Sequence, residues 1–183
     1  YCTLDNKNTD SNMATYLKNY PEASIWDETE AISKVNTPIL ILGSNVDKNS
    51  RLDSLSSTYS KLKNGYLSII DGMLHAQAIA VDALEPYIFA EAILKKQAYA
   101  HITSQPEDSI NQIEVNMPKG LEIEKVYLLY TTDEPSVNNT YSRIRLTHEK
   151  NQITFESIEE ARIYFVNIIL SNGQVISTKV IKK

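Results

Sequence analysis

A carboxylate and an imidazole stand at the ends of two apolar segments that follow each other along the chain. Asp47 ends the run Thr37-Pro-Ile-Leu-Ile-Leu-Gly-Ser-Asn-Val-Asp47, and His75 ends the run Tyr66-Leu-Ser-Ile-Ile-Asp-Gly-Met-Leu-His75. A histidine that is oriented by an aspartate can take a proton from a nucleophile and return it to a leaving group. The two residues therefore predict acid–base chemistry, in which Asp47 orients His75 and stabilises its charged form.

The segments around this pair have the patterns needed to bring it together. Residues 39–42 form a continuous apolar run, which is typical of a strand buried on both faces. Between residues 51 and 62 apolar side chains recur every three or four positions, which predicts a helix, and a second strand is expected at 66–70. Because a right-handed strand–helix–strand crossover brings both strand ends to the same sheet edge, we expect Asp47 and His75 to lie close together there.

The order of the pair fits the last two members of a nucleophile–acid–base triad. Taken singly, the aspartate would be a turn or cap residue and the histidine a packed or surface residue. The chain has no Gly-x-Ser-x-Gly elbow; Ser11 and Ser24 precede Asp47 but lack flanking glycines and a preceding apolar strand, so neither is assigned a catalytic role. Two explanations stay open: an upstream polypeptide supplies the serine, or the chain is a non-catalytic module that binds a glycan or a protein.

Three stretches carry a resemblance to a known group of enzymes. The segment from Ile25 to Asp47 resembles the approach to the acid in secreted bacterial α/β-hydrolases of the acetylxylan-esterase and PhoPQ-activated pathogenicity-related types. Asp71-Gly-Met-Leu-His75 resembles their glycine-containing approach to the catalytic histidine. Val126-Tyr-Leu-Leu-Tyr-Thr-Thr-Asp133, with Arg143 and Arg145 downstream, is similar to a pattern in the small C-terminal β-domain that some of them carry.

The resemblance covers residues 25 to about 183 in order, and it implies a function. The chain would be the C-terminal portion of a serine α/β-hydrolase that cleaves acyl or acetyl esters of a small molecule or a polysaccharide. Asp47 and His75 would be its catalytic residues, it would need no cofactor or metal, and its location would be extracytoplasmic, either periplasmic or secreted. The sequence departs from the usual pattern at Gly43-Ser44-Asn45 and at Met73-Leu74, and neither departure removes a functional group.

After residue 97 the pattern changes to short strands with alternating polarity. Turn residues separate them, and Asn172-Gly173 is the clearest hairpin signal. The predicted strands are 112–116, 125–132, 141–147, 152–156, 161–170 and 174–181. We therefore predict an α/β region followed by an all-β region. Residues 1–104 would be the C-terminal part of a parallel α/β-hydrolase sheet, with a second helix over 78–97 bent near Pro86, and residues 105–183 an antiparallel sandwich of the immunoglobulin or fibronectin-III kind.

Composition restricts the partners. The net charge is −5 and the basic residues are dispersed, so no surface for tracking nucleic-acid phosphates is expected. No apolar run approaches the roughly 20 residues needed to cross a bilayer. Cys2 is the single cysteine and the three histidines are far apart, which leaves no zinc spacing. His101 and His148 are expected to be solvated.

The strand over 38–42 is expected to need a further neighbour. In the predicted sheet, it and the strand over 66–70 would leave an apolar flank with unpaired backbone donors and acceptors. A missing upstream segment or a second copy of the chain is therefore expected to complete the sheet.

Overall fold

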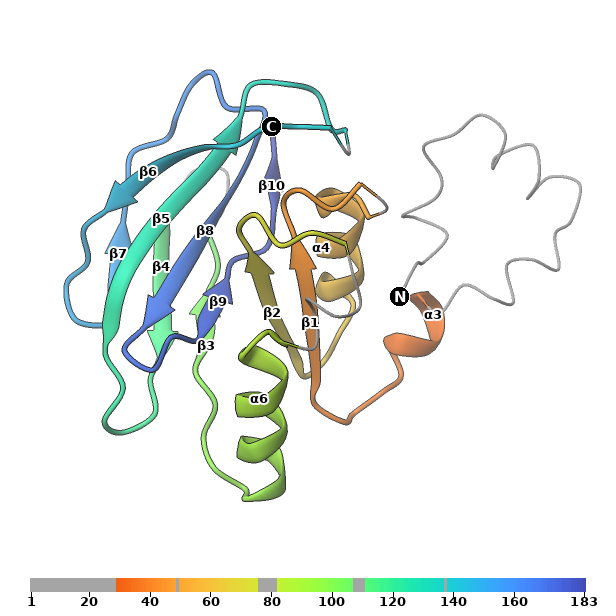
Figure 1. Cartoon of the computed structure of the whole chain (residues 1–183), viewed down its shortest axis with the longest axis vertical. Helices are drawn as coiled ribbons and strands as arrows, with labels where there is room; N and C mark the ends of the chain where they lie inside the picture. The colour runs from red at the N-terminus through yellow and green to blue at the C-terminus, as the bar shows by residue number, and fades with distance from the viewer. Residues whose placement is uncertain (1–28, 49, 76–81, 107–110, 137) are drawn as a thin grey trace, which may run out of the picture.

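The computed structural model describes residues 29–48, 50–75, 82–106, 111–136 and 138–183. Strands make up 37% of it and helices 16%, so the molecule is mostly β (Figure 1). None of the helices in these ranges is long and apolar enough to cross a membrane.

One parallel pair of strands carries the two residues singled out by the sequence. Strand β1 (Ile39–Ser44) pairs in parallel with β2 (Gly65–Ile70), and α4 (Leu52–Ser60) connects them. The short helix α3 (Thr29–Ile32) precedes β1, and α6 (Glu85–Leu94) follows β2. We call β1, α4, β2 and α6 together the parallel unit.

The other strands form two antiparallel sheets. The larger sheet has the order β10-β8-β5-β6, with β9 also paired to β8, and the smaller sheet has the order β3-β4-β7. The strands of the larger sheet are β5 (Ile123–Thr131), β6 (Ser142–Leu146), β8 (Ile163–Leu170), β9 (Val175–Ser177) and β10 (Ile181–Lys182). Those of the smaller sheet are β3 (His101–Ser104), β4 (Gln112–Asn116) and β7 (Gln152–Thr154).

The larger sheet is covered on both faces, which explains the apolar sequence of β8, in which Asn167 is the one polar residue. Val166 and its same-face neighbours pack with Ile113 and Ile153 of the smaller sheet. Phe165 points to the opposite face and packs with Leu55 of α4 and Ile69 of β2. A strand buried on both faces has no polar side to alternate with the apolar one. The parallel unit is therefore the second cover of the antiparallel sheet, and Figure 1 shows it beside β8 and β9.

Side-chain hydrogen bonds attach the parallel unit to the antiparallel sheet. Three of them form a closed ring: the Ile69 N–H donates to Ser177 Oγ (2.8 Å), the Ser177 hydroxyl donates to Asn167 Oδ1 (2.7 Å), and Asn167 Nδ2 donates to the Ile69 carbonyl (2.8 Å). In addition, the Val180 N–H donates to Ser56 Oγ of α4 (2.8 Å), and the Val175 N–H donates to Glu85 Oε1 of α6 (2.9 Å). Helix α4, helix α6 and strand β2 thus each have a polar link to the antiparallel part of the molecule.

The predicted fold class is wrong. The expected α/β architecture requires an extended parallel sheet, whereas the described parallel pairing consists of β1 with β2, and the remaining sheets are antiparallel. The physical reason is that β2 turns its outer edge to side chains of β8 and β9 instead of to another parallel strand. The division into residues 1–104 and 105–183 stays a prediction, although β3 and β4, which lie on either side of it, pair with each other.

Three further details differ from the predictions. The helix expected over 78–97 is described as α6, which begins at Glu85, so Pro86 lies in its first turn, where a proline is tolerated; residues 78–81 lie outside the described ranges. Strand β3 was not predicted. The hairpin after β8 forms, but only Gly173 in its turn has a positive φ (+85°), so the turn is not of the primed type.

Candidate functional site

The structure brings Asp47 and His75 together, as the crossover argument predicts. Asp47 lies in the turn after β1, and His75 lies in the turn after β2, at the carboxyl ends of both strands. The distance from His75 Nδ1 to Asp47 Oδ2 is 2.8 Å, which is within the ordinary range of a hydrogen bond. We refer to these two residues as the Asp–His pair; their catalytic role stays a prediction.

The two members of the pair differ in exposure, and the difference suits the chemistry. The Asp47 side chain is 13% exposed, whereas the His75 side chain is 52% exposed. When Nδ1–H donates to the carboxylate, the other ring nitrogen, Nε2, keeps a free lone pair. The shielded carboxylate can therefore hold the ring while the open imidazole exchanges a proton with a group that approaches from solvent.

A buried asparagine connects the two turns that carry the pair. Asn45 is 7% exposed; its Nδ2 donates to Asp71 Oδ1 (2.7 Å), and its Oδ1 accepts from the Gly72 N–H (2.9 Å). Gly72 has a φ of +77°, a conformation that glycine adopts without strain. Within the first turn the Val46 N–H donates to Ser44 Oγ (3.2 Å). Both turns are thus held by side-chain contacts as well as by the strands.

The antiparallel sheet reaches the same place through Arg143 of β6. Its Nη1 lies 3.6 Å from Asp71 Oδ2, and its guanidinium carbon lies 4.8 Å from the centre of the Tyr127 ring. The side chains of Arg143 and Asp71 are 57% and 41% exposed, so water screens this ion pair. The two oxygens of Asp71 therefore contact Asn45 on one side and Arg143 on the other.

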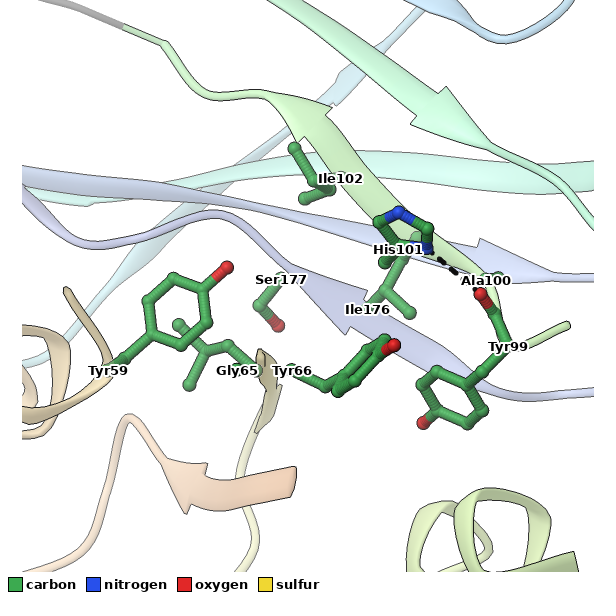
Figure 2. Close-up of a pocket in the computed structure, with 10 residues that line it drawn as sticks. Tyr59, Gly65, Tyr66, Tyr99, Ala100, His101, Ile102, Ile176 and Ser177 are labelled. Atoms are coloured by element: carbon green, nitrogen blue, oxygen red, sulfur yellow. Dashed lines mark hydrogen bonds between the residues drawn. The ribbon is translucent and has the colours of Figure 1, made fainter. Parts of the chain in front are cut away.

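A hollow lies where β2, β3 and β9 meet, and it is less suited to chemistry than the Asp–His pair. Figure 2 shows Tyr66, Tyr99 and His101 along it, with Tyr59 and Ser177 opposite. Its volume is about 10 Å³, enough for about one water molecule. Ser177 is already part of the hydrogen-bond ring, and Tyr59 accepts a hydrogen bond from Gln105 Nε2 (3.3 Å). This hollow is a packing site.

The tyrosines around this hollow pack against neighbouring aromatic rings. Tyr66 lies edge-on to Tyr99 and to His101, with ring centres 5.2 and 5.8 Å apart. Burial raises the pKa of Tyr59 above its ordinary value, and the pKa of Tyr99 rises from burial and from the nearby Glu85 carboxylate. Both phenols therefore stay neutral well above pH 7, and their role is packing.

The other residues considered from the sequence lie elsewhere. Ser11 and Ser24 lie outside the described residues, as does Trp26. The expectation that His101 is solvated is wrong, because it lies on β3, is partly buried, and has its Nδ1 3.0 Å from the Tyr99 carbonyl. His148 is exposed, as expected, and its Nδ1 lies 3.1 Å from the Lys150 carbonyl.

Sequence reasoning missed Asn45 and Asp71 as members of the site. A signal was present, since both are polar residues directly after apolar strands, on the same two turns as Asp47 and His75. Comparison with known proteins adds nothing to this geometry: no protein-family model, curated protein or solved structure matches the chain. The Asp–His pair and its surroundings are therefore the basis for assigning a function.

Proposed function

We propose that this chain supplies the acid and the base of a serine hydrolase that cleaves carboxylic esters. The single observation that carries the proposal is the 2.8 Å contact between Asp47 Oδ2 and His75 Nδ1 at the carboxyl ends of β1 and β2. In this function Asp47 holds the ring with Nε2 free. His75 then takes the serine proton during attack on the ester carbonyl and gives it to the departing alcohol.

The surface beside His75 supports an acyl substrate. Leu74 is 61% exposed, although leucine is an apolar residue. An exposed apolar side chain on the residue that precedes His75 offers contact to the hydrocarbon part of an acyl group. A small-molecule ester or an ester on a polysaccharide satisfies this requirement equally.

The nucleophile in this proposal comes from an upstream polypeptide that also adds a strand to β1. The Ile39 N–H donates to the Asn64 carbonyl (3.0 Å), and from this register the backbone groups of Leu40, Leu42 and Ser44 point away from β2. The sheet order gives β1 no second neighbour among the described strands. Since a parallel strand would end beside the Asp–His pair, it would deliver a serine to the correct edge.

The surface of α6 supports the same partner. The helix is apolar around most of its circumference, yet Leu84, Tyr87 and Leu94 at or beside it are 43%, 59% and 83% exposed. An apolar helix of this kind is normally buried. Helix α6 contacts β1, so one polypeptide could cover the helix and the β1 edge together.

The proposal is tested with a fluorophosphonate probe, which labels an activated serine. The 183-residue chain is compared with the product of the complete reading frame that contains it, and the labelled residue is identified by mass spectrometry. We expect no labelling of the 183-residue chain, and labelling of one serine in a Gly-x-Ser-x-Gly segment of the complete product. His75→Ala should abolish this labelling, while His148→Ala, which changes an exposed histidine elsewhere, should leave it unchanged.

Two results would overturn the proposal. A serine that is labelled equally well in His75→Ala does not use His75 as its base. A complete product that has no labelled serine favours the alternative of a module that binds a glycan or a protein. Sedimentation of the 183-residue chain provides a further check, because a stable dimer would make a second copy, instead of an upstream strand, the candidate that covers α6 and the β1 edge.

A further inference from the structure

We propose that Asn45 is a positioning residue that fixes the hydrogen bond between Asp47 and His75 by clamping their two turns together. This inference rests on the proposed function for its importance, but the clamp itself is a geometric claim about four side chains and one backbone amide. Asn45 does not contact the reacting atoms. It acts through Asp71 and Gly72.

Asn45 lies in the first turn and makes two hydrogen bonds to the second turn. It stands two residues before Asp47, in the first turn, and its amide bonds both the side chain of Asp71 and the backbone of Gly72 in the second turn. Gly72 lies three residues before His75. Asn45 is the buried member of this set at 7% exposure, whereas Asp71 and Gly72 are exposed, so the clamp is shielded from water on the Asn45 side.

The pair itself lacks the same protection. His75 is about half exposed and lies in a turn, and among the described residues its ring is held against solvent by the hydrogen bond to Asp47. In the Nδ1–H tautomer, Nε2 carries the free lone pair and can act as the base. A ring freed from Asp47 would lose its preference for this tautomer. The clamp therefore determines whether the correct nitrogen is available, in addition to any contribution to stability.

The tautomer of His75 is the direct readout. Long-range proton–nitrogen correlation spectra of the 183-residue chain, recorded with the imidazole neutral, distinguish the Nδ1–H from the Nε2–H form. We expect the wild-type ring to be mainly Nδ1–H. Asn45→Ala should remove this preference and leave a mixture in which the Nε2–H form predominates.

A polarity swap provides the rescue. Asn45→Asp alone places two carboxylates within hydrogen-bond distance and should disturb the tautomer as Asn45→Ala does. Asn45→Asp combined with Asp71→Asn restores a donor at position 71 and an acceptor at position 45 for the Gly72 N–H. The double variant should return the ring to the Nδ1–H form.

Ser177→Ala is the matched control for a general loss of stability. It breaks the ring that attaches β2 to the antiparallel sheet, so the protein should be less stable, but the tautomer should not change. The proposal is overturned if folded Asn45→Ala keeps the Nδ1–H form, or if the folded double variant fails to restore it. If Asn45→Ala does not fold, the comparison of Asn45→Asp with the double variant decides.

These outcomes are separate from the fate of the proposed function. The tautomer is measured without substrate, so the clamp can hold in a chain whose complete product has no reactive serine. Conversely, labelling that depends on His75, together with an unchanged tautomer in Asn45→Ala, would reject the clamp alone.

Discussion

The two outer edges of the parallel pair have different surroundings. On β2, the outward N–H and carbonyl of Ile69 are both bonded, by Ser177 and Asn167 of the antiparallel sheet. On β1, the outward groups of Leu40 and Leu42 have no strand beside them in the described part of the chain. Both strands have similar apolar sequences, so the difference lies in what each edge meets.

The comparison shows how side chains, instead of another strand, can bond the backbone groups on the outer edge of a parallel strand. Asn167 and Ser177 supply one donor and one acceptor in the places where a neighbouring backbone would supply them. This satisfies a buried edge that would otherwise cost free energy. It also makes β2 the boundary of the parallel pairing, and it leaves β1 as the side on which further polypeptide can add.

The largest effect is expected from the side chain that joins the antiparallel sheet to the parallel unit. Phe165 is fully buried between β8 and the parallel unit, so Phe165→Ala should lower the free energy of unfolding by about 3–5 kcal/mol. Urea denaturation measures this loss. Hydrogen exchange should rise more in β2 than in β4, whereas Val166→Ala, which faces the other core, should produce the opposite distribution. An equal rise in both strands for both variants would contradict the two-faced packing.

A smaller loss is expected from breaking the hydrogen-bond ring. Asn167→Ala leaves the Ile69 carbonyl and the Ser177 hydroxyl without their partner, which should cost about 1–3 kcal/mol. In hydrogen-exchange measurements the Ile69 amide should lose protection, while the amide of Leu40 on the open edge should exchange rapidly in both proteins. A Leu40 amide protected as strongly as that of Ile69 in the wild type would remove the contrast between the edges.

Alkaline pH should also weaken the contact between the two regions. Burial, assisted by the charge of Asp53, raises the pKa of Tyr141 to about 12, compared with about 10 in the unfolded chain. The unfolded state therefore loses its proton first. This contribution to stability is complete below about pH 10 and is lost as the pH rises toward 12, on the order of 2 kcal/mol. Tyr141→Phe should reduce the fall measured by urea denaturation over this range; an unchanged slope would contradict it.

The smallest effect is expected from the exposed ion pair between the antiparallel sheet and the turn after β2. Arg143→Ala removes contacts to Asp71 and Tyr127, but both charged side chains are open to water. The free energy of unfolding should fall by less than about 1 kcal/mol, and added salt should reduce the difference from the wild type. A loss of several kcal/mol would mean that Arg143 contributes to the clamp around Asp71 more than its exposure indicates.

Local patterns in the sequence predicted the parts of the fold that depend on local rules. The apolar run of β1, the helical spacing of α4 and the handedness of the crossover were enough to bring Asp47 and His75 together. The alternating segments after residue 111 likewise correspond to strands. These features follow from periodicity and chirality, which a single sequence contains.

The sequence did not predict what the parallel unit packs against. The apolar sequence of β8 shows that both faces are buried, but it is the same whether helices or a pair of strands cover the second face. Nothing in the local sequence identifies Asn167 as the hydrogen-bond partner of the Ile69 carbonyl, 98 positions earlier. Asn45 was missed for the same reason, because its partners lie on another turn. Such long-range polar contacts depend on the tertiary arrangement, and their absence from the sequence argument led to the incorrect α/β fold class.

The central claim is that Asp47 and His75 act as the acid and base for a serine that an upstream polypeptide supplies. The most direct measurement is kcat/KM for an activated acyl ester, using the product of the complete reading frame. Asp47→Asn should lower it by about 10⁴-fold, and His75→Ala by at least as much, while His148→Ala stays near the wild type. The 183-residue chain by itself should hydrolyse the ester no faster than its own His75→Ala variant. Robust turnover by the 183-residue chain, or turnover of the complete product that survives His75→Ala, would contradict the account.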